Sequence, residues 1–286
     1  MKKKGKRTAY AFLLPSLCGV LVFYLLPFAD VVRRSFLTAV TGEFKGLDNY
    51  RAVLENEAFG LAAKNTARFA LCCLPLLIGA GLLIAAVIAG HRRLRIFLSV
   101  YLLPMAIPTA TVVLVWNMLF DRWGLLNGLC GKMAELAGWE HVFDTDYMDT
   151  KAAFWVLIAS YIWKNLGYTV TLWLSGLLSV PEQLKEAAAV DGAGRWQIFW
   201  KVVFPQLLPS LYTITVLSFI NSFKVFREAY LVAGSYPHES IYLLQHLFNN
   251  WFVDLSLDKM AAAAVMTGAV MIAAILLLEY LWERDE

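Results

Sequence analysis

The feature that most constrains the fold is a series of long apolar blocks. They lie at about residues 9–29, 66–89, 96–119, 152–178, 210–232 and 260–281, and each is close to the roughly 20 residues with which an α-helix crosses a bilayer. Only helices and closed barrels span lipid, because each unpaired backbone group there is costly. The blocks are continuous and lack the two-residue alternation of a barrel strand. The sequence therefore predicts an all-α membrane protein, with residues 1–286 forming one domain of six transmembrane helices.

Composition agrees with this class and excludes several others. Apolar residues make up 59% of the chain and charged residues 16%, against about 45–50% and about 25% in soluble domains. The four cysteines and four histidines show neither metal-ligand spacing nor a disulfide framework, so we expect no metal site. The net charge of +3 reflects membrane topology and does not indicate a nucleic-acid partner. Because prolines fall within or at the ends of the spans, some helices should be kinked: Pro15, Pro75, Pro104 and Pro108.

The basic residues predict an orientation. They are dense in KKKGKR at residues 2–7 and in HRRLR at residues 91–95, and cytoplasmic loops carry such an excess. With six spans, both termini and the segment at about 179–209 then also lie in the cytoplasm, although Arg33 and Arg34 go against the trend.

The basic start would also suit a cleaved signal peptide, but no A-x-A-like site follows it. We favour a retained first span.

Residues 179–209 form a polar interruption late in the apolar chain. Ser179 to Glu182 is typical of a helix start, with Ser as the cap and Pro in the first turn. The helix should continue through Ala189 and break at Asp191–Gly194, where two glycines permit unusual backbone angles. A second short helix from Arg195 to about Val203 should end before Pro205.

The small residues of this segment indicate a docking surface. Ala187, Ala188 and Gly192 allow another surface to approach the backbone closely. The alternative is an amphipathic helix that lies on lipid headgroups. The residues alone leave both interpretations open.

The run EAAAVDGAGRWQIFWKVVFP at residues 186–205 resembles the EAA loop of ABC importer permeases. The family pattern is EAA, three residues, Gly, nine residues and then I-x-L-P; this chain matches it at the right spacing, with Val and Phe in place of Ile and Leu. In that family the loop is a coupling helix that fits a groove on the cytoplasmic ATPase. The resemblance implies these ATPase-coupling residues: Glu186, Ala187, Ala188, Asp191, Gly192, Val202, Phe204 and Pro205.

Other stretches resemble carbohydrate-importer permeases in particular. They are FKGLDNYRAVL (44–54), NTARF (65–69), GLLNGL (124–129) and SFINSFKVFREAY (218–230), so the resemblance runs from about residue 9 to residue 282. The chain departs from the family at VAGSYPHES (232–240), where those proteins often have a Gly-rich turn such as TGGGP.

Polar residues inside two of the spans suggest a path for a solute. Polar groups in a membrane are expensive and usually face a cavity or a partner, and aromatic rings beside amide and hydroxyl groups suit a sugar. Each set of residues also has an explanation that involves no solute. Asn165 would join its helix to a neighbouring helix. Lys224 and Glu228 are four residues apart and could pair, or their side chains would extend to the membrane interface. Trp163 and Lys164 are assigned to packing. The candidate path residues are Tyr161, Asn165, Tyr168 and Thr169 in the fourth span and Asn221, Lys224 and Glu228 in the fifth.

No catalytic group is expected, because the phosphate-binding pattern G-x-x-x-x-G-K-[ST] is absent. ATP and Mg²⁺ would be bound by a partner ATPase, and the chain itself would need no cofactor. The resemblance implies the transmembrane subunit of an ATP-driven importer in a bacterial cell membrane, surrounded by membrane lipid, which translocates a sugar or oligosaccharide by alternating access. The implied partners are a second homologous permease, a cytoplasmic ABC ATPase dimer and an extracellular or periplasmic sugar-binding protein.

Three other functions stay open from the residues. The chain could be a permease for a non-sugar solute such as glycerol phosphate. It could be a membrane scaffold or sensor that recruits a cytoplasmic protein. A secondary transporter is the third, although the inverted repeats of that class are not visible.

Overall fold

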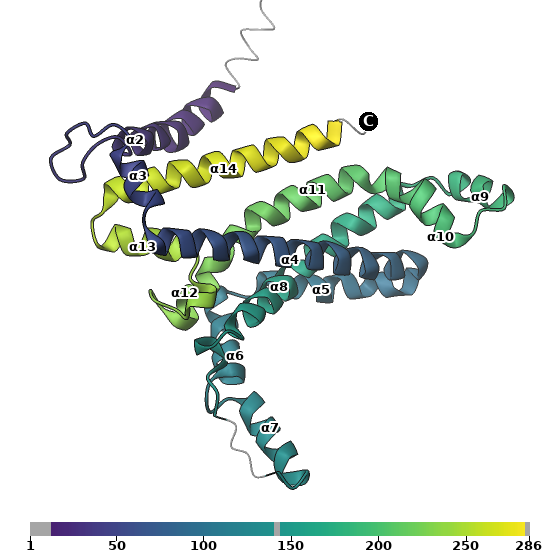
Figure 1. The fold of residues 1–286 in the computed structure, drawn as a ribbon. Helices are drawn as coiled ribbons and strands as arrows, with labels where there is room; N and C mark the ends of the chain where they lie inside the picture. The colour runs from purple at the N-terminus through teal and green to yellow at the C-terminus, as the bar shows by residue number, and fades with distance from the viewer. Residues whose placement is uncertain (1–12, 140–143, 284–286) are drawn as a thin grey trace, which may run out of the picture. The chain divides into compact units, whose positions relative to one another are not determined.

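The computed structural model describes residues 13–139 and 144–283. Within them the chain is helical, apart from loops and one isolated bridge between Leu37 and Phe44, which confirms the predicted all-α class (Figure 1). The basic start at 2–7, the first residues of the first predicted span (9–12) and the end of the C-terminal tail (284–286) lie outside the described residues. Contacts divide the chain into two compact units: Met1–Gly60 with Leu247–Leu281, and Leu61–His246 with Trp282–Glu286.

The first unit begins with one apolar helix, Leu13–Arg34. It contains a π-helical turn, η1 (Leu21–Leu25), and then α2 (Leu26–Arg34), and so extends past the predicted end at residue 29. Pro27 lies in the first turn of α2, where its missing N–H is tolerated, and the Leu26 N–H bonds the Leu21 carbonyl across the π turn. The other elements of this unit are α3 (Asp48–Leu54), most of α13 (Leu244–Val253) and most of α14 (Leu257–Glu283).

The second unit holds the remaining elements. In chain order they are α4 (Glu57–Gly90, whose first turn belongs to the other unit), η2 (Arg92–Phe97), α5 (Leu98–Ala106), α6 (Thr109–Phe120), α7 (Leu125–Leu136), η3 (Tyr147–Asp149), α8 (Ala153–Ser179), α9 (Glu182–Val190), α10 (Arg195–Ile198), η4 (Phe199–Val203), α11 (Phe204–Ser222), η5 (Phe223–Val225), α12 (Phe226–Ala233) and η6 (Glu239–Ile241).

Four helical segments of the described chain are long and apolar enough to cross a membrane: Leu13–Arg34, Glu57–Gly90, Arg195–Ala233 and Leu257–Tyr280. A fifth is present if Leu98–Ala106 and Thr109–Leu136 form one span, although they meet at 95°. The predicted third span, 96–119, is therefore broken. Pro108, which precedes α6, cannot donate a helical hydrogen bond and restricts the residue before it. The predicted fourth span corresponds to α8, which has 27 residues but carries polar residues in its middle.

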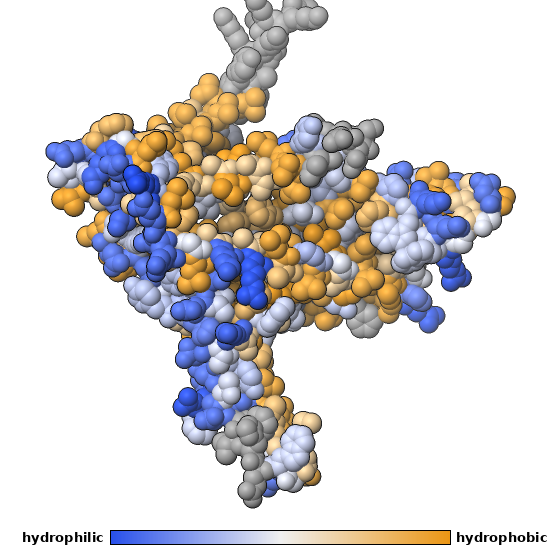
Figure 2. All heavy atoms as spheres, in the orientation of Figure 1, coloured by the Kyte–Doolittle hydropathy of each residue, from blue (hydrophilic) through white to orange (hydrophobic). Residues whose placement is uncertain are grey.

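The helices of the second unit pack closely where they carry glycine. A Cβ on Gly167 of α8 would collide with the Tyr101 carbonyl of α5, and a Cβ on Gly176 would collide with Ser210 of α11. Small residues let helix backbones approach in this way in membrane proteins. In Figure 1, α5 and α11 lie along α8. Figure 2 shows apolar side chains covering much of the visible surface of these helices, as expected for contact with lipid.

Candidate functional site

The α9–α10 loop follows α8 and is built largely as predicted. α9 runs from Glu182 to Val190, and the turn after it depends on Gly192, whose φ of +83° disfavours a side chain. The predicted cap is wrong: Ser179 is the last residue of α8, and its hydroxyl donates to the Gly176 carbonyl at 2.7 Å. Pro181 occupies the N-cap position of α9. Because α8 continues through Ser179, the serine lies two residues before the N-cap position of α9, and no side chain caps α9.

The second helix of the loop does not end before Pro205. α10, the π-helical turn η4 and α11 follow one another without a break. The Phe204 N–H bonds the Phe199 carbonyl across the π turn, and Pro205 lies in the first turn of α11. Because the wider turn re-pairs the backbone just ahead of the proline, the helix continues into the fifth span.

The side chains of the loop have few partners within the chain. No residue of α9 is buried, and three apolar side chains are exposed: Leu184 at 44%, Val190 at 87% and Trp196 at 73%. Figure 2 shows apolar atoms among hydrophilic ones around α9 and α10. Of the predicted coupling residues, Glu186, Ala187, Asp191, Gly192 and Pro205 are exposed and Ala188, Val202 and Phe204 are half-buried.

Four aromatic side chains form a cluster at the C-terminal end of the α9–α10 loop. Trp196, Phe199, Trp200 and Phe204 contact one another, and the Trp200 and Phe204 rings are 4.8 Å apart. The cluster joins α10 to the start of α11, which continues into the fifth span.

A second polar region is a cavity of about 220 Å³ within the second unit, between α8 and α12. Five predicted path residues line it: Tyr161, Asn165, Asn221, Lys224 and Glu228. The remaining lining comes from α5, α6, α8, η5 and α12: Met105, Thr109, Ser160, Lys164, Val225 and Arg227.

A largely buried ion pair lies in the wall of this cavity. Lys164 Nζ lies 2.5 Å from Glu228 Oε1 and donates a second hydrogen bond to Thr109 Oγ1 at 3.1 Å. The two side chains are only 21% and 9% exposed. The assignment of Lys164 to packing is therefore wrong. Lys224 does not pair with Glu228; it donates to Asn221 Oδ1 at 2.8 Å, and Lys164 is the cation that meets the Glu228 carboxylate.

Two other predicted path residues do not line the cavity. The hydroxyls of Tyr168 and Ser218 are hydrogen-bonded at 2.6 Å, and the Tyr161 hydroxyl donates to the Ser218 carbonyl at 2.6 Å. Thr169 is fully buried and donates to the Asn165 carbonyl at 3.1 Å. Tyr168 therefore joins α8 to α11, and the Thr169 hydroxyl is satisfied within α8 itself.

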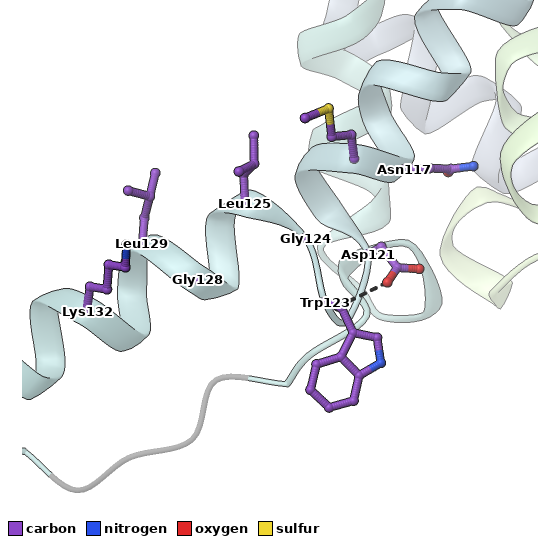
Figure 3. A pocket seen from close by; sticks show the side chains of 9 residues that line it. Asn117, Asp121, Trp123, Gly124, Leu125, Gly128, Leu129 and Lys132 are labelled. Atoms are coloured by element: carbon purple, nitrogen blue, oxygen red, sulfur yellow. Dashed lines mark hydrogen bonds between the residues drawn. The ribbon is translucent and has the colours of Figure 1, made fainter.

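A larger cavity of about 500 Å³ lies at α6 and α7 and holds none of the predicted residues. Figure 3 shows Leu125, Leu129 and Lys132 of α7 projecting to one side, while Asp121 accepts a hydrogen bond from the Trp123 N–H at 3.0 Å. Leu125 and Leu129 are exposed and the cavity contains no buried charge. Its charged lining residues, Asp121 and Lys132, are exposed, unlike Lys164 and Glu228 of the cavity between α8 and α12.

Sequence reasoning missed Thr109, Lys164 and Arg227. An ionisable residue in the middle of a span is by itself a signal of function, and Lys164 carried that signal. Among residues 13–139 and 144–283, no group of three or more His, Cys, Asp or Glu side chains could hold a metal ion.

Similar proteins are permeases of import systems. The chain is 26% identical over 278 residues to the sn-glycerol-3-phosphate transport system permease protein UgpA of Agrobacterium fabrum, covering 94% of this chain and 92% of the relative. It is 28% identical over 263 residues to the probable ABC transporter permease protein YesP of Bacillus subtilis, covering 86% and 82%.

Two solved structures share the fold. One is a bacterial ABC transporter involved in the import of the acidic polysaccharide alginate, with a TM-score of 0.81, 21% identity and coverage of 98% of this chain and 96% of the other. The second is the bacterial alginate ABC transporter in complex with an alginate pentasaccharide-bound periplasmic protein, with a TM-score of 0.79, 22% identity and coverage of 99% and 96%.

The family described as binding-protein-dependent transport system inner membrane component matches residues 78–283. This range contains both the α9–α10 loop and the cavity between α8 and α12. The chain therefore belongs to the family of inner membrane components of binding-protein-dependent transport systems, in which it is a transport subunit and not an enzyme.

Proposed function

We propose that the chain is one of two homologous permease subunits through which an ATP-driven importer moves a sugar or oligosaccharide into the cytoplasm. A cytoplasmic ABC ATPase dimer docks on α9, and a binding protein delivers the solute on the opposite side of the membrane. Both termini and the α9–α10 loop lie in the cytoplasm, as the positive-inside pattern favours. The sugar assignment rests on the resemblance of residues 44–54 and 218–230 to carbohydrate-importer permeases.

One observation carries the proposal: a single helical segment, Arg195–Ala233, connects the exposed loop to the polar cavity. Its 39 residues span about 58 Å at 1.5 Å per residue. α10 and the aromatic cluster lie at its beginning, and Asn221, Lys224 and Glu228 lie near its end. A movement at the docking surface therefore acts on side chains that line the cavity.

The short breaks in this segment give it points at which to bend. η4 (Phe199–Val203) lies near the docking loop and η5 (Phe223–Val225) lies beside the cavity. Departures from α-helical geometry inside a helix often mark hinges or functional sites. We propose that closure of the ATPases on ATP displaces α9 and shifts the permease from an inward-facing to an outward-facing state. ATP can do so only by binding one state more tightly than the other.

A second candidate solute is a glycerol phosphate, which one observation favours. The name of the UgpA relative includes sn-glycerol-3-phosphate, and three of the four charged side chains at the cavity are cationic. The ABC transporter whose solved structure has the TM-score of 0.81 is involved in the import of alginate, which is also acidic.

The test uses the complete transporter, with its partner permease, ATPase and binding protein, in proteoliposomes. Glu186→Lys reverses the charge of an exposed α9 side chain, and Gly192→Trp places a bulky group where the turn needs φ of +83°. Both should lower ATP-driven uptake at least tenfold and weaken copurification of the ATPase. The matched control is Glu135→Lys, the same change on an exposed residue of α7, which should change neither quantity.

Two outcomes would contradict the proposal. Full uptake by Glu186→Lys combined with Gly192→Trp would remove the coupling role of α9. If instead a cytoplasmic protein copurified through α9 while no solute entered the vesicles with any energy source, the scaffold function would be correct.

A further inference from the structure

The cavity between α8 and α12 carries more positive charge than it neutralises. Lys164, Lys224 and Arg227 line it, and Glu228 is the only acidic residue in its lining. Glu228 is committed to Lys164 at 2.5 Å, so the charges of Lys224 and Arg227 remain in excess. Lys224 has an amide oxygen as its partner, on Asn221. No carboxylate in the described part of the chain pairs with either of them.

Such an excess is expensive in a membrane protein. Ionisable residues within spans usually pair with one another or mark the path of a solute. A neutral sugar would not offset two unpaired cations, because its hydroxyls carry no charge. An anionic group on the solute would, through charge-assisted hydrogen bonds that are roughly twice as strong as neutral ones.

The Lys164–Glu228 pair leaves one donor of Lys164 available in the lining of the cavity. The Lys164 ammonium has three N–H groups, of which one bonds Thr109 and one bonds Glu228. The remaining N–H can meet an anionic oxygen. Glu228 holds Lys164 in place when no solute is bound, and so the ammonium is already positioned.

Arg227 adds the geometry that selects the anion. The planar guanidinium offers two parallel donors that match the oxygens of a carboxylate or a phosphate. Arg227 is exposed at the cavity, one residue before the buried Glu228 on α12. It can therefore contact an incoming solute before the solute reaches Lys164.

The volume limits what the cavity holds. At about 220 Å³ it is smaller than the roughly 300–1,000 Å³ of most small-molecule pockets. It suits one charged sugar unit, or a three-carbon phosphate, and not several units of a chain at once.

We infer that this cavity, lined by Lys164, Arg227, Lys224 and Asn221, is a binding site for the anionic group, a carboxylate or a phosphate, of an acidic solute. The inference rests on the proposed import function, because it names the chemical class of the solute that the importer carries.

The test measures binding of three radiolabelled probes of similar size to the reconstituted transporter in nanodiscs: glucose, glucuronate and glucose 1-phosphate. At least one charged probe should bind at least tenfold more tightly than glucose, and this preference should fall with added salt. The carboxylate and phosphate arms show which anion the site takes. Arg227→Gln should lower the preference at least fivefold, and Lys224→Gln should lower it by a smaller factor.

The control variant is Lys132→Gln, which removes an exposed lysine of α7 and should leave the preference unchanged. Binding of neither charged probe above glucose, or a preference that Arg227→Gln leaves intact, overturns the inference. ATP-driven uptake of a neutral sugar that still depends on Glu186 would refute the anionic site and keep the proposed function. If uptake no longer depended on Glu186 while the charged probes still bound more tightly than glucose, only the proposed function would be refuted.

Discussion

The α9–α10 loop and the cavity between α8 and α12 are both polar interruptions of an apolar chain, but they are held in opposite ways. The loop keeps its shape through backbone hydrogen bonds around Gly192 and leaves its side chains exposed. The cavity is fixed by side chains, above all by Lys164 and Glu228 from different helices. A loop of the first kind can exchange partners without unfolding, whereas removal of one member of a buried pair leaves a charge without compensation.

The largest difference between the two regions should appear when the buried pair is broken. Lys164→Met leaves Glu228 with 9% of its side chain exposed and without its cation, which should lower the free energy of unfolding by about 3 kcal/mol. The double variant Lys164→Met/Glu228→Leu removes both charges and should recover most of that loss. Thermal unfolding of the purified permease in detergent measures both.

The control for this experiment is Lys224→Met, which removes an exposed lysine bonded only to Asn221. It should change the free energy of unfolding by less than about 1 kcal/mol. A double variant no more stable than Lys164→Met would show that the pair is not the interaction that holds the cavity.

A smaller effect on stability should come from protonation of His246. This residue of α13 lies outside the membrane-spanning segments, and its ring contacts Phe226 of α12. Its Nδ1 accepts the Leu243 N–H at 3.1 Å, so the proton lies on Nε2, which is buried without a hydrogen-bond partner in the described chain. The Phe226 ring is 4.7 Å away, edge to face. Burial lowers the pKa of His246 from its usual 6.5 to about 4.

The sign of the pH dependence follows from this shift. Between pH 6.5 and pH 4 the unfolded chain binds a proton that the folded chain does not, so the stabilisation by neutral His246 is complete above pH 6.5 and is lost as the pH falls. The loss should reach about 2 kcal/mol by pH 5. His246→Asn keeps an acceptor for Leu243 and does not titrate, so it should remove this dependence. The exposed His91→Asn should retain it, and equal slopes for the two variants would contradict the assignment.

The two regions also differ in how well the sequence predicted them. The loop is determined by neighbours in the chain, and so the helix, the break at Gly192 and the family pattern were readable from residues 186–205. The Lys164–Glu228 pair joins residues 64 positions apart. The spacing of four residues along one helix favoured Lys224 as the partner of Glu228. No rule that uses neighbours in the chain could predict that Lys164, on another helix, lies closer to Glu228. The continuation of the helix past Pro205 was missed because a π turn before a proline has no simple sequence signal.

The turn of the loop offers a narrower test. Gly192 has φ of +83° and Gly194 has φ of −69°, so Gly192→Ala should cost about 1 kcal/mol of local stability and Gly194→Ala should cost less. The loss should appear as faster amide hydrogen exchange in α9, with unchanged global unfolding. Similar exchange in the two variants would mean that the left-handed turn does not hold the loop.

The smallest effect on folding is expected for substitutions of two exposed valines, which test docking of the ATPase separately from stability. Val190 at the end of α9 and Val40 in the loop after α2 are 87% and 95% exposed, so Val190→Asp and Val40→Asp should each change the free energy of unfolding by less than about 0.5 kcal/mol. Only Val190→Asp should weaken copurification of the ATPase, because it places a carboxylate, which must be desolvated, on the proposed docking surface. If both variants retained the ATPase equally, the exposed apolar side chains of α9 would not be the contact. The charge of Glu186 and the backbone around Ala187 and Ala188 would then have to provide it, which Glu186→Lys tests separately.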